Sequence, residues 1–510
     1  MGLAEFWIIP VAVLGAIVGS FLNVVIYRLP LGLSTTQPRW SFCPHCHERI
    51  RPHHNIPILS WLLLRARCSR CRAPIAETYP IVECLTMLLF VGIWDALFLE
   101  GIAPGVAGPA ADWPMAIAYI VLFAALLAGS AMDIETYTID IRVCLLATCV
   151  GVACHGLWGL PSQVLPPQSV SPLGLPPTVA KPTLLPPLLS LIVVAAGAAW
   201  LLTCLAVACV RRPQATADSQ DESDGEKPVD DRIAVDAPDE ANQEPSDNGV
   251  LQEPGAHRFR PLSVLALCGA ILALLAWQLY GRHWGFSTRL DPGLQRGVAV
   301  CFLFMLTLIL ASMVPRQADD TIVGEIEAER SHARSTALRE FAWFLPAVLI
   351  GLALLLITRH LDWLGLSWRQ VLEDHRSSSM WAVHAAAALH AIACAVLAGA
   401  VGWSVRILGT LAFNKEAFGT GDIYIMAAIA AVGGFWLLFF AFFLAALSAL
   451  VGVLATVFHK SSRAIPFGPW LSLGAFMAMW FQNALLDWFR PAGLMLWSVI
   501  SGRPQYLFGG

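Results

Sequence analysis

Long apolar segments alternate with short polar connections along nearly the whole chain of 510 residues. Many of these segments reach the roughly 20 residues that a helix needs to cross the hydrocarbon core of a bilayer. We therefore predict an all-α polytopic membrane protein with about 12 transmembrane helices. One segment, 422–434, is short for a full crossing. The expected spans are roughly 6–27, 80–99, 113–132, 141–160, 188–210, 262–280, 297–315, 340–358, 383–405, 422–434, 436–458 and 466–486.

The composition agrees with this pattern. Hydrophobic residues make up 57% of the chain, charged residues 13%, and the mean hydropathy is +0.64. A soluble protein carries about twice that charged fraction, so the composition excludes an ordinary soluble enzyme. The net charge of -4 carries little information, because the charges are segregated by region. We expect a lipid bilayer as the environment and no nucleic-acid partner.

The positions of the first charges predict the topology. No basic residue precedes the first apolar segment, and the first positive charge, Arg28, follows it. A secretory signal has the reverse order, so we expect a retained helix whose N-terminus lies outside the cytoplasm. The loop 28–79 is rich in arginine, which favours a cytoplasmic location. Counting spans from there brings Asp133 and Asp422, almost three hundred residues apart, to the same membrane face.

Two polar stretches interrupt the apolar pattern. Residues 161–187 are rich in proline, which is typical of an extended loop, here on the outer side. Residues 213–257 are acidic and almost free of aromatic residues. Such a segment cannot bury enough apolar surface to fold, so we predict a disordered cytoplasmic linker.

The arginine-rich loop carries two C-x2-C pairs that are separated by 21 residues. Each pair lets two thiolates reach one ion, and two pairs complete a tetrahedral site. Four soft ligands with no open position predict structural zinc, and a cytoplasmic location disfavours disulfides. The histidines of the loop are weaker candidates, because four cysteines already fill the site. The predicted ligands are Cys43, Cys46, Cys68 and Cys71.

The sequence "FGTGD" places Asp422 at the start of an apolar segment. A carboxylate there is costly, which usually marks function or a hidden partner. We expect Gly419 and Gly421 to allow a tight turn that admits a substrate strand. Asp422 would then lie at a helix N-terminus, where amide donors stabilise negative charge. For Asp133 or Asp422 alone, an interfacial residue at a helix end is the alternative interpretation.

Five motifs together resemble those of the type IV prepilin peptidases, which are integral-membrane aspartic peptidases of the bacterial inner membrane. The resemblance covers roughly 1–160 and 383–486, whereas 161–382 has no counterpart in that family. The motifs are "GSFLNVVIYRLP" (19–30), "NIPILSWLLLR" (55–65), "YPIVE" (79–83), "EAFGTGD" (416–422) and "IPFGP" (465–469).

The resemblance also implies a division of the chain. The predicted parts are, in order, a first transmembrane helix, a cytoplasmic zinc loop, helices with the first aspartate, an atypical insertion, helices with the second aspartate, and a tail. The corresponding ranges are 1–27, 28–79, 80–160, 161–382, 383–486 and 487–510.

The resemblance implies an activity as well. Family members cut the leader peptide from type IV prepilins and pseudopilins, and many then methylate the new N-terminus with S-adenosylmethionine. The catalytic aspartates of the family fall on Asp133 and Asp422, in a site that faces the cytoplasm. Two such carboxylates share a proton in a low dielectric, so that one acts as base and one as acid.

Two residues depart from the family pattern, which commonly has proline at Asp140 and lysine at Tyr424. The departures leave open an impaired homologue that acts as a membrane scaffold for pilus or secretion-system assembly, or an enzyme with one of the two activities. Asp95, His384 and His390 are expected to be interfacial or paired, not catalytic. The sequence leaves the oligomeric state open.

Overall fold

The structure is a computed structural model. It describes residues 6–37, 39–99, 108–158, 187–210, 268–271, 273–274, 292–312, 333–363, 380–458, 466–482 and 484–489. The predicted linker 213–257, the proline-rich loop before residue 187 and most of the predicted span 262–280 lie outside these residues.

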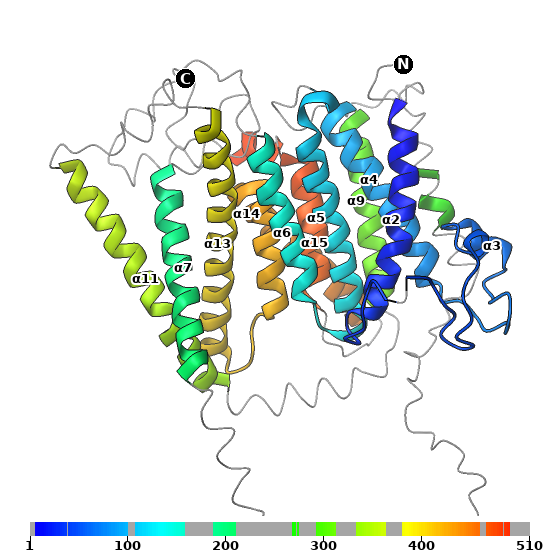
Figure 1. The fold of residues 1–510 in the computed structure, drawn as a ribbon, viewed down its shortest axis with the longest axis horizontal. Coiled ribbons are helices and arrows are strands. Elements are labelled where there is room, and N and C mark those ends of the chain that lie inside the picture. Colours follow the sequence, from blue (N-terminus) through cyan, green and yellow to red (C-terminus); the bar gives the residue numbers. More distant parts are fainter. Residues whose placement is uncertain are drawn as a thin grey trace, which may run out of the picture.

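The described chain is helical and contains no β-strand, only two isolated bridges in the cysteine loop. The short elements are a 3-10 turn (Pro52–His54), α3 (Leu59–Leu63) and a π-turn (Asp95–Leu99) that continues α4. The long helices are α2 (Ile8–Arg28), α4 (Thr78–Trp94), α5 (Pro109–Thr136), α6 (Ile141–Trp158), α7 (Pro187–Val210), α9 (Pro292–Ser312), α11 (Ala333–Trp363), α13 (Met380–Phe413), α14 (Thr420–Phe458) and α15 (Gly468–Trp480) (Figure 1).

Seven of the helices in the described chain are long and apolar enough to cross a membrane. In two further helices, α7 and α9, the apolar range is shorter: Ser190–Leu202 and Gln295–Ala311. An all-α protein with several helices able to span a membrane is therefore confirmed. The predicted count of about 12 spans is not confirmed.

The longest helix, α14, is broken in its middle. Gly434 adopts φ 77° and ψ 179°, a region that is essentially restricted to glycine. Asp422, before the break, lies against Gly468, and Gly452, after the break, lies against Trp470. Both therefore lie beside the N-terminal end of α15, so the chain reverses direction at Gly434. The two predicted spans 422–434 and 436–458 correspond to the two halves.

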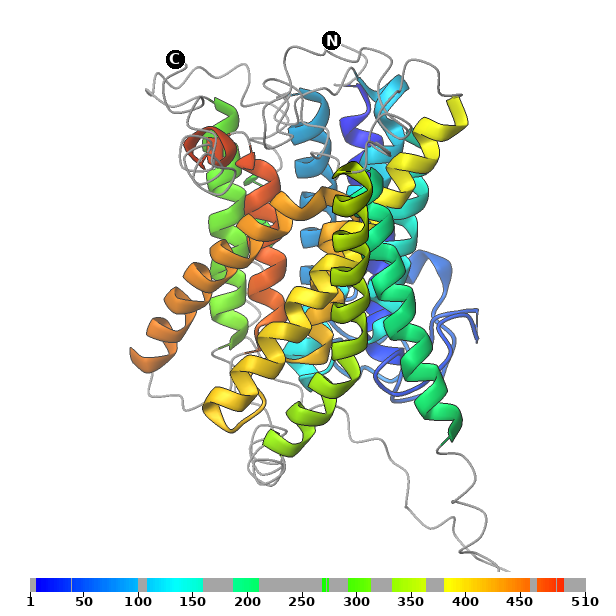
Figure 2. The ribbon, with the colours of Figure 1, turned by 90° about the vertical axis from the view of Figure 1, so that its left-hand side faces the viewer.

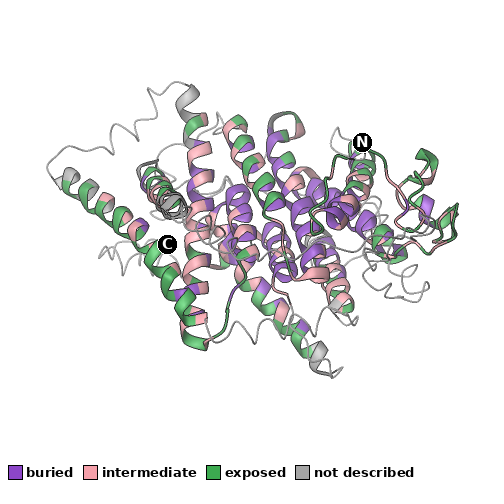
Figure 3. Ribbon diagram, turned by 60° about the horizontal axis from the view of Figure 1, so that its bottom comes forward, coloured by how far each residue is buried: buried purple, intermediate pink, exposed green. Residues whose placement is uncertain are grey.

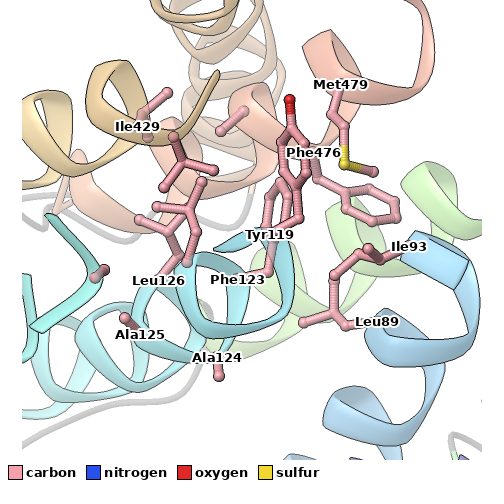
Figure 4. Packing of buried hydrophobic residues seen from close by; sticks show 14 of the residues in the cluster. Leu89, Ile93, Tyr119, Phe123, Ala124, Ala125, Leu126, Ile429, Phe476 and Met479 are labelled. Atoms are coloured by element: carbon pink, nitrogen blue, oxygen red, sulfur yellow. The ribbon is translucent and has the colours of Figure 1, made fainter. Parts of the chain in front are cut away.

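The core lies where α4, α5, α14 and α15 pack together (Figure 4). Buried residues gather in the middle of the helix bundle (Figure 3). The ring of Phe123 on α5 meets Phe476 on α15 edge to face at 5.4 Å, and Leu89 and Ile93 of α4 lie beside them. In the spans of α4 and α5, 78% and 72% of the residues are buried, against 11% in α11. Helices α7, α11 and α13 form a peripheral group at one side (Figures 1 and 2).

One helix of the stretch 161–382, which the sequence predicts to be an insertion, packs against the core. Helix α9 packs against α14 and α15, where Gly297 approaches the Trp480 indole so closely that a Cβ would clash with it. Arg296 donates a hydrogen bond to Asp95 at 3.1 Å, and both side chains are buried. Breaking a buried ion pair by removing one partner is costly, so this contact ties α9 to α4. The expectation that Asp95 is paired is confirmed.

Candidate active site and metal centre

Residues 42–49 and 67–74 fold into two similar turns, each closed by an antiparallel bridge between its first and last residue. Each turn carries one C-x2-C pair. In both, the residue after the second cysteine has a positive φ, 53° at His47 and 62° at Arg72. Its amide donates to the carbonyl of the first cysteine, at 2.8 Å in one turn and 3.1 Å in the other. The same local backbone thus aims both pairs of thiols at one point.

The four predicted ligands are together in the structure. Their Sγ atoms all lie within 4.8 Å of one another, and those of Cys43 and Cys71 are 3.8 Å apart. A tetrahedral ion with Zn–S bonds of about 2.3 Å requires sulfur atoms about 3.8 Å apart. The cluster therefore fits a four-coordinate zinc with no open position, as the sequence predicts. Within the described residues it is the one group found that could hold a metal.

The cysteine loop is fastened to α4, and α4 is held closely against α2. The buried Glu83 carboxylate of α4 accepts a hydrogen bond from the Ile58 amide at 2.7 Å. The Asn23 amide of α2 donates to the Tyr79 carbonyl at 3.2 Å. Gly19 lies against the backbone of Glu83, where a Cβ would be 2.7 Å from its Cα. Residues from three of the quoted motifs thus join the loop to α4 and α4 to α2.

Asp133 and Asp422 lie together, as the predicted topology requires. Both are buried, Asp133 near the C-terminal end of α5 and Asp422 in the first turn of α14. A Cβ on Gly468, the first residue of α15, would lie 2.7 Å from Oδ2 of Asp133 and 3.3 Å from Oδ1 of Asp422. These two oxygens are therefore no more than about 6 Å apart, close enough for each charge to act on the other.

The two oxygens of the Asp422 carboxylate have different surroundings. Its Oδ1 is fully buried and has no hydrogen-bond partner among the described residues. Its Oδ2 lies 3.3 Å from the point that a Cβ on Gly419 would occupy. A buried polar oxygen without a partner is rare and costly, and it calls for an explanation. A water molecule or a substrate group between the carboxylates would provide the missing partner.

The structure gives a packing reason for one of the two glycines of "FGTGD". Neither Gly419 nor Gly421 is among the residues with positive φ in the described chain, so a left-handed turn does not explain them. A Cβ on Gly421 would lie 2.9 Å from the Ile139 side chain. Gly421 therefore makes room for the turn between α5 and α6, which lets α5 and α14 approach.

Sequence reasoning missed two contributors to this site. Gly468 belongs to the quoted motif "IPFGP" but was given no role, although its missing side chain leaves room for both carboxylates. Phe418 and Phe467, each directly before a glycine of the site, pack with their ring centroids 5.7 Å apart. The repeated Phe-Gly pair was the available signal, and it joins the start of α14 to the start of α15.

The other acidic and aromatic residues near the site have ordinary surroundings. Asp140 accepts hydrogen bonds from Arg142, the shortest at 2.6 Å, and this contact lowers the pKa of Asp140 below its usual value. Glu135 is half-buried, and Tyr424 packs against the hydrophobic core. Asp140 therefore forms a local ion pair at the start of α6, as expected of a structural residue in a turn.

The two histidines that were expected to be interfacial or paired both have partners. His384 Nδ1 lies 2.6 Å from the Gly156 carbonyl, and the buried His390 ring lies 3.4 Å from Cys394 Sγ. Both are on α13, in its first half, whereas the loop that carries "FGTGD" follows its C-terminal end. Neither histidine takes part in the aspartate site.

Comparisons with known proteins agree with the motifs. Residues 13–96 match the bacterial peptidase A24 N-terminal domain. That range includes the four cysteines and neither aspartate. No solved structure matches the chain.

Several curated relatives are similar to parts of the chain. A Myxococcus xanthus prepilin leader peptidase/N-methyltransferase is 59% identical over 78 residues, 15% of this chain and 23% of the relative. An Escherichia coli type 4 prepilin-like proteins leader peptide-processing enzyme is 39% identical over 139 residues, 24% of this chain and 46% of the relative. A Burkholderia pseudomallei prepilin leader peptidase/N-methyltransferase is 36% identical over 172 residues, 29% of this chain and 51% of the relative.

The chain thus spans about half or less of the length of these relatives. Within that span, the resemblance to the prepilin peptidases that the motifs indicated is confirmed.

Proposed function

We propose that the protein is a membrane aspartic endopeptidase that removes the leader peptide of type IV prepilins and pseudopilins. The observation that carries the proposal is the meeting of Asp133 and Asp422 on either side of Gly468. The similarity to prepilin leader peptidases supports the choice of substrate. The single unpartnered oxygen of Asp422 supports a reacting group at that point.

The proposed chemistry is amide hydrolysis by two carboxyl groups. One carboxylate takes a proton from a water molecule, whose oxygen adds to the scissile carbonyl carbon. The other, protonated, carboxyl group donates a hydrogen bond to the carbonyl oxygen and polarises it. The C–N bond then breaks, and the leaving nitrogen takes a proton from the pair. Because the two groups share a proton, the roles belong to the pair and not to one residue.

The zinc loop has a structural role in this proposal. Four cysteine ligands leave no position for a substrate or a reacting water, so a bound zinc would stabilise the fold of residues 42–74. When bound, the ion supplies charge that holds the thiolates together. The loop would remain attached to α4 through Glu83.

We extend the proposal to a second step, methylation of the new N-terminus with S-adenosylmethionine. The support is that several similar relatives carry both activities in their names, prepilin leader peptidase/N-methyltransferase. The proposed location is the bacterial inner membrane, with the aspartates on the cytoplasmic side. The C-terminal ends of α2 and α5 lie at the same end of the bundle, so the arginine-rich loop and Asp133 share that side (Figure 1).

The test is incubation of the purified protein in detergent with a panel of prepilin and pseudopilin precursors, with and without S-adenosylmethionine. Mass spectrometry should show the loss of the leader and, with the methyl donor, the added mass of one methyl group. A protein that binds precursors without cutting any of them would contradict the proposal and favour the scaffold alternative.

A further inference from the structure

The loop that carries "FGTGD" is fastened to α13 by one arginine. Arg406 lies on α13, and its Nη1 donates to the Phe418 carbonyl at 2.8 Å and to the Glu416 carboxylate. The guanidinium also lies over the Trp403 ring, with its Cζ 5.7 Å from the centroid. Phe418 directly precedes Gly419, so Arg406 holds the backbone that leads into the first turn of α14.

The other edge of the same guanidinium is held by a residue from a different part of the chain. The Arg406 Nε lies 3.3 Å and 3.2 Å from the two carboxylate oxygens of Glu340, in the first half of α11. The exposed fractions of these two side chains are 12% and 16%, against 43% for Glu416. The pair with Glu340 is therefore the more shielded from water, where an ion pair is screened less.

The position of Glu340 in the chain is informative. It lies within 161–382, the region for which the family offers no counterpart, on a helix that is otherwise largely exposed. Figure 1 shows the N-terminal end of α11 beside the C-terminal end of α13, and the two helices are in contact. This contact places Glu340, a side chain of the insertion, beside the arginine that holds the loop before Asp422.

The loop has other restraints besides Arg406. The buried Phe418 ring packs against Phe442 and Phe467, and the Asn414 amide donates to the Thr410 carbonyl at 2.9 Å. The Ala417 amide donates to the Thr410 hydroxyl at a long 3.4 Å, and the Ala417 methyl lies close to Gly409.

A planar guanidinium held by Glu340 at Nε and by Glu416 at Nη1 is fixed in orientation, and Nη1 in this orientation also reaches the Phe418 carbonyl. With Glu340 neutral or absent, Arg406 keeps only the more exposed Glu416 as a charged partner.

We propose that Glu340 is a positioning residue, which orients Arg406 so that the loop 414–419 delivers Asp422 to Asp133. A residue of the atypical insertion then contributes to the geometry of the aspartate site. The inference rests on the proposed peptidase function for its effect on catalysis, but the ordering of the loop is a property of the protein by itself.

The kinetic test compares Glu340→Gln with Arg339→Gln, a substitution of the exposed neighbour on the same helix. A misplaced catalytic group acts on the chemical step, so kcat for a prepilin precursor should fall by about 10- to 100-fold in the first variant, with KM little changed. Glu340→Asp, which keeps the charge on a shorter side chain, should recover part of the loss. The control variant should match wild type.

A second test needs no substrate. Hydrogen exchange of the backbone amides of 414–422 should become faster in Glu340→Gln and stay unchanged in Arg339→Gln, because the loop opens more easily without its support. Should Glu340→Gln not accumulate as folded protein, Glu340→Asp provides the same comparison with a smaller change. Zinc content and thermal unfolding serve as checks of the overall fold.

The two tests separate the two proposals. If wild type cuts precursors and Glu340→Gln cuts them at the same rate, the positioning role is wrong and the peptidase function stands. If wild type cuts nothing, the proposed function fails, and the exchange experiment decides the inference alone. Unchanged exchange over 414–422 in Glu340→Gln would overturn it in either case.

Discussion

The cysteine cluster and the aspartate pair are built in opposite ways. The four thiols lie within one loop, on two turns that repeat the same backbone, and few long-range contacts define them. The two carboxylates lie on helices that are almost three hundred residues apart, and they meet only because α5, α14 and α15 pack together. A local site can form once its turns form, whereas a dispersed site depends on every helix contact that brings its parts together.

The strongest test of this comparison removes one carboxylate at a time. Asp133→Asn and Asp422→Asn should each reduce cleavage by at least about 100-fold, because general acid and base catalysis contribute about that much or more. Both variants should remain folded and keep their zinc, since neither residue touches the cysteine loop. Cleavage rates and metal content are measured on the same purified samples.

Asp140→Asn is the control for these two variants. Its carboxylate is bound to Arg142 at the start of α6, so substantial activity should remain. Full activity in Asp133→Asn together with an inactive Asp140→Asn would show that the wrong acidic residue near α5 has been chosen.

The next prediction breaks the dispersed site without changing a charged group. Gly468→Ala would place a methyl group 2.7 Å from Oδ2 of Asp133, so the carboxylates or α15 must move. A displacement of this kind can reduce the rate by about 100-fold. Steady-state cleavage kinetics of the purified variant measure the loss.

Gly399→Ala on α13 is the matched control, because a Cβ there meets nothing within 4 Å. It should behave like wild type. Equal activity of the two alanine variants would mean that the contact between Gly468 and the aspartates has no importance for cleavage.

The local site is broken by removing its ligands. Cys46→Ser combined with Cys71→Ser should release the zinc and unfold residues 42–74, because metal binding is coupled to folding in such sites. Cleavage should fall less than in the aspartate variants, since the loop contributes neither carboxylate. Elemental analysis and limited proteolysis of the loop measure the two effects.

Cys149→Ser serves as the control, because this exposed cysteine lies on α6, away from the cluster. Loss of metal with no change in protease resistance of the loop would argue against a structural role for zinc.

The smallest effect is expected from the acidic linker. Deletion of 218–250 should leave cleavage near the wild-type rate, because a segment of this composition supplies no packed contact. The cost of loop closure changes by only about 0.6 kcal/mol for each doubling of length, so stability should hardly change. Rates in detergent are compared with those of full-length protein. A deletion that stops cleavage while zinc content and insertion stay normal would identify a regulatory or docking element.

Some of these features were determined by the sequence alone. Helical spans follow from runs of apolar residues, and the zinc ligands follow from two C-x2-C pairs, because both depend on residues that are near one another in the chain. The motifs around Asp133 and Asp422 also identified the two candidate carboxylates, and the count of spans predicted that they share one membrane face.

Only the tertiary structure decided how the aspartate site is held. It showed that Gly468 lies between the carboxylates and that Gly421 makes room for Ile139. It also placed Arg296 beside Asp95 and Glu340 beside Arg406. No periodicity or spacing reports such contacts, because a buried ion pair or a close helix approach joins residues whose separation in the chain carries no signal. The sequence therefore determined which groups could react, and the packing of distant helices decided which of them meet.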